Sequence, residues 1–126
     1  MSNDVTFAQA SPPAYKDLGI PATVASAKAM TAAELRAAVI GVVAYTEDSA
    51  IATVAGWPAA ADGSVAVDSQ LGVEVFHELT GHLVSSKYPI SLAAIPQAKW
   101  ASIDGLVSVL TDVYSAMKEP KVKVQS

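Results

Sequence analysis

The sequence predicts an all-α fold, a small bundle of three to five helices with extended arms at both ends of the chain. Three observations lead to this prediction. A helix-capping pattern opens a first segment at Thr31, an amphipathic pattern covers residues 69–86, and apolar residues recur in steps of three and four from Trp100 to Met117. A proline follows each of the three segments, where the missing N–H stops a helix.

The length and composition of the chain fit one small domain. A chain of 126 residues normally builds a single core, and 52% of its residues are hydrophobic, so there is enough apolar material to bury. Much of that share is alanine, and aromatic residues make up only 6%. Alanine contributes less apolar burial than leucine or phenylalanine, so we expect a core of small and aliphatic side chains that gains part of its stability from neighbouring molecules.

Prolines and helical patterns divide the chain into three regions. Residues 1–30 are expected to form an N-terminal arm, because prolines interrupt helices there and leave room only for a short helix over residues 22–29. Residues 31–118 are expected to form the helical core domain. Residues 119–126 form a C-terminal tail, in which residues 121–124 alternate charged and apolar side chains like an edge strand that either hangs free or pairs with a partner.

The first core helix begins at a capping box. Thr31 is followed three residues later by Glu34, and this pair satisfies two backbone amide groups at a helix start. The apolar residues behind it recur at helical spacing and leave open whether residues 32–56 form one helix or two, with a break near Tyr45. Residues 58–68 then connect to the next helix, with room for a brief strand where two valines alternate with other residues.

The second helix is expected over residues 69–86, with Asp68 or Ser69 as its N-cap and Pro89 after its end. The final helix is expected over residues 97–118. Its apolar residues form a seam and a second flank, so we expect it to be central to a bundle or shared with another subunit. The seam and the second flank consist of Trp100, Ile103, Val107, Leu110, Tyr114, Met117, Leu106, Val109 and Val113.

These helical patterns together predict the core. Trp100 and Trp57 are interpreted as core residues rather than as platforms for a stacked ligand. The predicted core includes Leu35, Val39, Val42, Val75, Leu79, Leu83, Ile103, Val107, Leu110 and Tyr114.

The charge of the chain argues against nucleic acid as a partner. The net charge is −4 and the isoelectric point is about 4.9. The eight lysine and arginine residues are scattered along the chain and form no basic stripe, which phosphate recognition needs. Protein partners are therefore expected, either further copies of this chain or other subunits of an assembly.

Cysteine content and the start of the chain limit its chemistry and location. The chain has no cysteine, which excludes disulfides, thiolate metal sites and thiol nucleophiles. The first residues lack the basic start and apolar run of a secretory signal, and no apolar stretch approaches the ~20 residues of a membrane span. We therefore expect synthesis in the cytoplasm without membrane insertion.

One short motif, His77-Glu78-Leu79-Thr80-Gly81-His82, suggests zinc chemistry. In helix-borne zinc peptidases two histidines one turn apart bind the metal and a glutamate activates water. Here the histidines are five residues apart, which on a regular helix places them about 140° apart, so a one-residue bulge is needed to bring them to one metal.

The motif resembles the HExxGH motif of the dipeptidyl peptidase III family of zinc exopeptidases, whose helix accommodates such an extra residue. The resemblance implies that His77 and His82 would be zinc ligands and Glu78 the general base. It covers six of 126 residues, and that family is several times longer and supplies a further glutamate ligand. Downstream of His82 only Asp104, Asp112 and Glu119 are acidic, so we expect two histidines at the edge of an amphipathic helix and no metal or other cofactor.

The remaining acidic pairs suggest helix positions rather than catalysis. Glu47 and Asp48 are expected to begin a helix, where negative charge is favourable, and Glu74 and Glu78 to form an i, i+4 pair on a solvated face. No serine lies in a nucleophile elbow. We therefore assign no catalytic, cofactor-binding or metal-binding residue.

Three functions remain as hypotheses. The favoured one is a structural or assembly subunit, for example a small protein of a phage or virus-like particle, held by protein contacts and terminal arms and incorporated into a virion. The second is an adaptor or inhibitor that binds a single protein partner. The third is a small zinc hydrolase that uses His77, Glu78 and His82.

Overall fold

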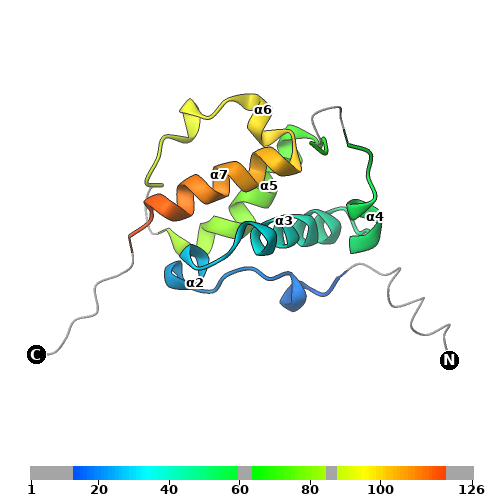
Figure 1. The fold of residues 1–126 in the computed structure, drawn as a ribbon, viewed down its shortest axis with the longest axis horizontal. Helices are drawn as coiled ribbons and strands as arrows, with labels where there is room; N and C mark the ends of the chain where they lie inside the picture. The colour runs from blue at the N-terminus through cyan, green and yellow to red at the C-terminus, as the bar shows by residue number, and fades with distance from the viewer. Residues whose placement is uncertain (1–12, 60–63, 85–87, 119–126) are drawn as a thin grey trace, which may run out of the picture.

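A computed structural model describes residues 13–59, 64–84 and 88–118 of the chain (Figure 1). Within them the secondary structure is helical throughout, which confirms the predicted all-α class. Residues 1–12 and 119–126, and with them most of the predicted extended arms, lie outside the described residues. The α-helices are α2 (Val24–Lys28), α3 (Ala32–Thr46), α4 (Ile51–Ala55), α5 (Ser69–Thr80), α6 (Gln97–Trp100) and α7 (Ile103–Ala116), and the 3₁₀ helices are η1 (Tyr15–Asp17), η2 (Gly81–Leu83) and η3 (Leu92–Ala94).

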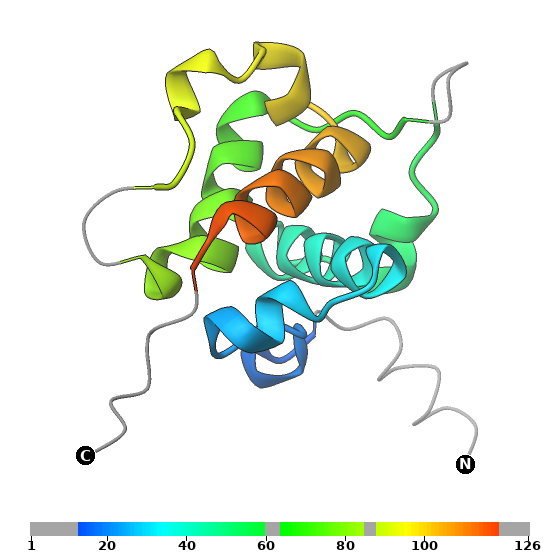
Figure 2. The ribbon, with the colours of Figure 1, turned by 60° about the vertical axis from the view of Figure 1, so that its left-hand side comes forward.

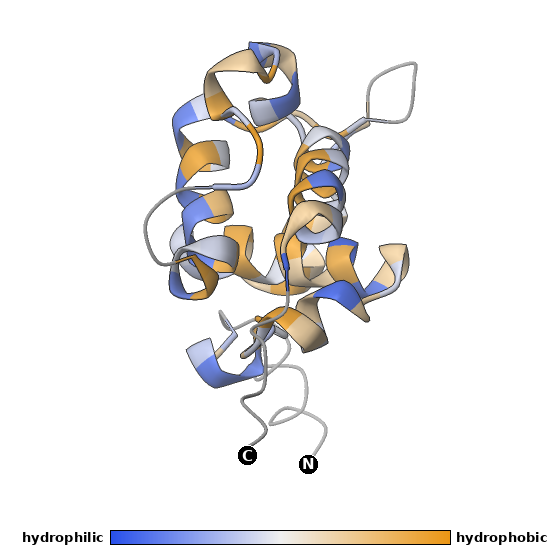
Figure 3. Ribbon diagram, turned by 90° about the vertical axis from the view of Figure 1, so that its left-hand side faces the viewer, coloured by the Kyte–Doolittle hydropathy of each residue, from blue (hydrophilic) through white to orange (hydrophobic). Residues whose placement is uncertain are grey.

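Three long helices, α3, α5 and α7, form the centre of the bundle. The described residues hold six α-helices rather than three to five, because α2, α4 and α6 add helices of only four or five residues. Figure 2 shows α7 crossing α5 and α3, and α7 contacts α2, α3, α5 and α6. This agrees with the central position predicted for the last helix. Figure 3 shows hydrophobic residues along all three long helices.

Side-chain caps fix where these helices begin. The Thr31 hydroxyl accepts a hydrogen bond from the Glu34 backbone N–H at 3.1 Å, and the Glu34 carboxylate accepts one from the Thr31 N–H at 2.8 Å. The predicted capping box is therefore confirmed. Asp68 caps α5, because its carboxylate accepts from the Gln70 N–H at 2.9 Å.

Residues 32–56 form two helices. The first, α3, ends at Thr46, and α4 begins at Ile51. The prediction that Glu47 and Asp48 begin a helix is wrong: Glu47 caps the C-terminus of α3, and Asp48 has a φ of 54°. Aspartate tolerates this left-handed conformation better than most residues, and it turns the chain between the helices.

The predicted continuous helix over residues 97–118 is divided into α6 and α7. The segment that precedes α5 lies beside the break between α6 and α7 and forms hydrogen bonds with it. The Val67 N–H donates to the Ala101 carbonyl at 2.9 Å, and the Ile103 N–H donates to the Val65 carbonyl at 2.8 Å. Ser102 then caps α7 by accepting from the Gly105 N–H at 2.8 Å. The connection forms two isolated bridges and no strand within the described residues.

Two glycines allow this arrangement. A Cβ on Gly72 of α5 would lie 1.8 Å from the Trp100 carbonyl oxygen, and a Cβ on Gly105 of α7 would lie 2.5 Å from the Lys99 carbonyl oxygen. The backbone of α6 therefore packs directly on α5 and α7.

The second helix is shorter than the predicted range of residues 69–86. It ends at Thr80 and continues as η2, whereas residues 85–87 lie outside the described part of the chain. The Thr80 side chain donates to the Phe76 carbonyl at 2.7 Å, a local bond that competes with the helical pattern. Thr80 itself has a φ of −130°, which is no longer helical.

Most of the predicted core is buried. Leu83 and Val107 are half-buried and pack against the core, as do Trp57 and Trp100. Residues 13–30 also contribute, because Leu18 and Ala27 are 3% and 2% exposed. None of the described helices is long and apolar enough to span a bilayer. The predicted core residues found buried are Leu35, Val39, Val42, Val75, Leu79, Ile103, Leu110 and Tyr114.

Candidate functional site

The motif at residues 77–82 spans the end of α5 and the whole of η2. His77 and Glu78 lie on the exposed side of α5, and His82 lies in the following 3₁₀ turn. The change from α to 3₁₀ geometry after Thr80 separates the two histidines into different elements. The role of each side chain in this structure is defined by its neighbours.

Glu78 contacts the N-terminal segment. Its Oε1 accepts a hydrogen bond from the Tyr15 hydroxyl at 2.9 Å. The hydrogen bond to this carboxylate raises the pKa of the Tyr15 phenol, because an ionised phenol could not donate it. The Tyr15 ring also packs edge-on against Tyr45 of α3, with centroids 5.3 Å apart. Glu78 therefore helps to hold η1 against α3 and α5.

His82 makes a second contact with the same segment. Its Nε2 lies 2.5 Å from the Pro21 carbonyl oxygen. Since a carbonyl oxygen only accepts hydrogen bonds, Nε2 carries the hydrogen in this contact and is not available to bind a metal. His77 is exposed, and its ring centroid lies 6.4 Å from that of Tyr88.

The middle of the motif is part of the core. The Leu79 carbonyl accepts from the Tyr114 hydroxyl at 2.7 Å. The Thr80 hydroxyl gives its hydrogen to Phe76 and lies 3.0 Å from the Tyr88 hydroxyl, so Tyr88 is the donor in that pair. The motif thus connects α5 to the N-terminal segment, to Tyr88 and to α7.

The acidic residues considered as further zinc ligands lie in other settings. The Asp104 carboxylate pairs with Arg36 and accepts from the Val65 N–H at 3.3 Å. Asp112 is exposed on α7, and Glu119 lies outside the described residues. Across residues 13–59, 64–84 and 88–118, no three histidine, cysteine, aspartate or glutamate side chains lie together as a ligand set.

An apolar groove of about 720 Å³ lies beside α3. Figure 1 shows residues 13–30 running along this helix. Ile51 and Ala55 of α4 also line the groove. We call this hollow the α3 groove. It is lined by Asp17, Leu18, Gly19, Pro21, Ser26, Ala29, Met30, Glu34, Ala37, Ala38, Ile40, Gly41, Ile51 and Ala55.

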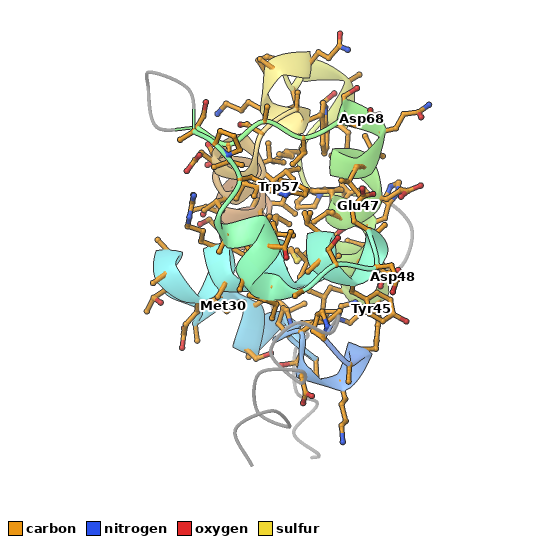
Figure 4. All side chains as sticks on the ribbon, turned by 90° about the vertical axis from the view of Figure 1, so that its right-hand side faces the viewer. Met30, Tyr45, Glu47, Asp48, Trp57 and Asp68 are labelled. Carbon is orange, nitrogen blue, oxygen red and sulfur yellow. The ribbon has the colours of Figure 1, made fainter. Side chains whose placement is uncertain are left out.

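The α3 groove owes its shape to small side chains. Ala37, Ala38 and Gly41 form part of its lining on α3, and they leave space that larger residues would fill. Met30 lines the groove after the end of α2 (Figure 4), and Ile51 lines it from α4 with 44% of its surface exposed. Among the lining residues only Asp17 and Glu34 are charged, and both are acidic.

Sequence reasoning did not find this groove. Residues 13–30 were expected to be an arm, whereas they pack against α3 and form one side of the hollow. The sequence of α3 did contain a signal for such a contact, because its apolar residues lie on all sides of the helix. A helix of this kind has more apolar surface than packing against a single neighbour can cover.

A second hollow of about 390 Å³ lies beside Trp57. The indole is half-buried and packs against the core, as predicted, but it also lines this hollow with Glu47, Asp68 and Glu74. Figure 4 shows Trp57, Glu47 and Asp68. The Asp68 carboxylate already caps α5, so this residue has a structural role as well.

Comparison of the chain with family models, with curated proteins and with solved structures finds no match.

Proposed function

We propose that this protein is a structural subunit of a larger assembly, joined by protein contacts to copies of itself or to other subunits. The α3 groove carries the proposal. It is a hollow of about 720 Å³ whose lining is mostly apolar, and contiguous apolar surface of this kind is typical of sites where proteins associate.

The location of the exposed apolar surface supports this choice. The last helix, α7, buries most of its apolar residues inside the bundle, and only Val107 among them is half-buried, so this helix has little apolar surface left for a partner. Large apolar side chains are exposed on other elements instead: Tyr45 of α3 is 45% exposed and Ile51 of α4 is 44% exposed, and Tyr15 and Val73 are exposed as well. Covering these side chains with a neighbouring molecule would remove apolar area from water, at about 25 cal/mol per Å².

The setting that we propose is a particle built from many subunits, such as a phage virion or a virus-like shell. The subunit would be synthesised in the cytoplasm and then incorporated. A composition rich in alanine and poor in aromatic residues supports this, because such a core gains from burial against neighbours.

The test is the mass of the full-length protein in solution, measured by light scattering over a range of concentrations. We expect the mass to rise with concentration above that of a 12.9 kDa chain. A parallel variant without residues 1–12 and 119–126 measures the contribution of the terminal regions, and it keeps Leu18, which is buried. A constant monomer mass would contradict self-assembly, and a discrete complex with one other protein would favour the adaptor hypothesis.

A further inference from the structure

The chemistry of the α3 groove defines what can occupy it. Its floor and sides are apolar, and its charged lining residues, Asp17 and Glu34, are both acidic. Glu34 takes part in the capping box only as a hydrogen-bond acceptor. A matching occupant has apolar side chains for the floor and lysine or arginine residues for the edge.

The C-terminal part of this chain has that composition. Residues 121–124 read Lys-Val-Lys-Val, so in an extended conformation the two valines share one face and the two lysines the other. Lysine has a long apolar stem that lets its ammonium group reach a carboxylate at the edge of a groove. Residues 1–12 contain no lysine or arginine and match the acidic edge less well.

The position of Lys118 favours binding between copies over binding within one chain. Lys118, Met117 and Val24 of α2 line one small hollow, whereas Ser26 of α2 lines the α3 groove. Val24 and Ser26 are two residues apart, and each helical residue rotates the side-chain direction by ~100° about the helix axis. The two side chains therefore point about 200° apart, to nearly opposite sides of α2. The tail therefore leaves the described structure on the side of α2 that faces away from the groove.

Chain length bears on the same choice. Within one copy, Val122 is four residues beyond Lys118, which corresponds to at most about 14 Å of extended chain, and it would have to pass around α2 to reach the groove. In a second copy the tail meets the groove without this detour.

Building on the proposed role in assembly, we infer that the α3 groove of one copy binds residues 121–124 of the next copy. Val122 and Val124 contact the apolar floor, and Lys121 and Lys123 pair with Asp17 and Glu34. The contact joins different surfaces of the two copies, so it repeats from copy to copy and builds a chain or a closed ring.

The inference is tested with two full-length variants that each damage one side of the contact. Ala37→Trp fills the groove and leaves the tail intact, and the double variant Val122→Asp, Val124→Asp damages the tail and leaves the groove intact. Each variant alone is expected to remain a monomer in light scattering. An equimolar mixture has one intact groove and one intact tail per pair and is expected to give a dimer that grows no further.

Matched controls identify the contact. Ala98→Trp places the same bulk on exposed surface of α6 and should assemble like the unaltered protein, as should Phe7→Asp in the N-terminal region. Circular dichroism verifies that every variant keeps its helices. Asp17→Lys in the groove-intact partner should weaken the mixed dimer about fivefold, and Lys121→Glu in the other partner should restore it.

The outcomes separate this inference from the proposed function. If the unaltered protein and both variants assemble alike, the assembly uses another surface, and the inference is wrong while the proposed function stands. Loss of assembly in Phe7→Asp alone would assign the groove to the N-terminal region and overturn the inference. If the unaltered protein stays monomeric at every concentration, both the inference and self-assembly fail.

Discussion

Tyr114 donates its phenolic hydrogen to the Leu79 carbonyl in the middle of the core. Burial raises the pKa of this phenol far above its ordinary value of 10.0, because an ionised oxygen would be taken out of water without compensation. The folded state therefore holds the proton more tightly than the unfolded chain. The resulting stability is fully present below pH 10.0 and decreases as the pH rises above that value toward the folded pKa.

Replacing this hydroxyl gives a prediction about stability and pH. Tyr114→Phe leaves a buried carbonyl without its donor, so the free energy of unfolding should fall by about 1–3 kcal/mol at neutral pH. The variant should also lose stability less steeply than the unaltered protein under alkaline conditions. Urea unfolding at neutral and alkaline pH measures both effects, and Tyr45→Phe, at a tyrosine 45% exposed, should change neither.

The residues of the HELTGH motif give a prediction about metal binding. The Glu78 carboxylate and the His82 ring form hydrogen bonds with the Tyr15 hydroxyl and the Pro21 carbonyl, and zinc would have to compete with these bonds. We therefore expect the purified protein to bind no stoichiometric zinc. Metal analysis after dialysis against zinc, together with titration calorimetry, measures this. One zinc per chain that is lost in His77→Ala would contradict the expectation and favour the hydrolase hypothesis.

At the scale of helices and turns, the starts of α3 and α5 were predicted, whereas the break between α6 and α7 was not. Thr31, Glu34 and Asp68 act through bonds within four residues, so local sequence shows them. The break between α6 and α7 depends on bonds from Val65 and Val67, which are more than thirty positions away. The steps of three and four between Trp100 and Met117 continue across the break, so periodicity alone could not reveal it.

The same scale explains why the candidate groove was missed. One side of it is made by residues 13–30, which contain Pro13 and Pro21 and no helical pattern long enough to predict packing. They fold onto α3 through single contacts, such as those of Tyr15 and Leu18. Contacts of this kind join residues far apart in the chain and leave no periodic signal.

Two glycines provide a matched prediction at this scale. Gly72→Ala would place a Cβ 1.8 Å from the Trp100 carbonyl oxygen, so α6 must move and the free energy of unfolding should fall by about 1–3 kcal/mol. Gly81→Ala places a Cβ where no atom lies within 4 Å, at a helical backbone conformation, and should be neutral or slightly stabilising. Chemical denaturation of both variants makes the comparison, and equal effects would show that α6 does not pack on α5 as described.

At the scale of the whole molecule, residues 13–30 and the bundle belong to one packed unit. Leu18 is as buried as Leu35 of α3, at 3% exposure each. The three long helices and the N-terminal segment therefore share one core of mostly aliphatic side chains. Such a unit is expected to unfold in one cooperative transition.

Substitutions at Leu18 test this unity. Leu18→Ala should lower the free energy of unfolding by about 2–5 kcal/mol, as Leu110→Ala should, because each removes a buried side chain. Ile51→Ala, at a residue 44% exposed, should cost less than either. Urea unfolding measures all three, and a loss well below 1 kcal/mol for Leu18→Ala would show that residues 13–30 are a loose arm after all.

Lys28 connects the two ends of the described chain. Its ammonium group donates to the carbonyls of Tyr114, Ser115 and Met117 at 3.2, 3.0 and 2.7 Å, and thereby caps the C-terminus of α7. These partners lie 86 to 89 positions further along the chain. During synthesis on the ribosome, α2 leaves the exit tunnel long before its partners do. The nascent chain therefore cannot close its core until residue 117 has emerged, and until then its apolar helices are available to chaperones.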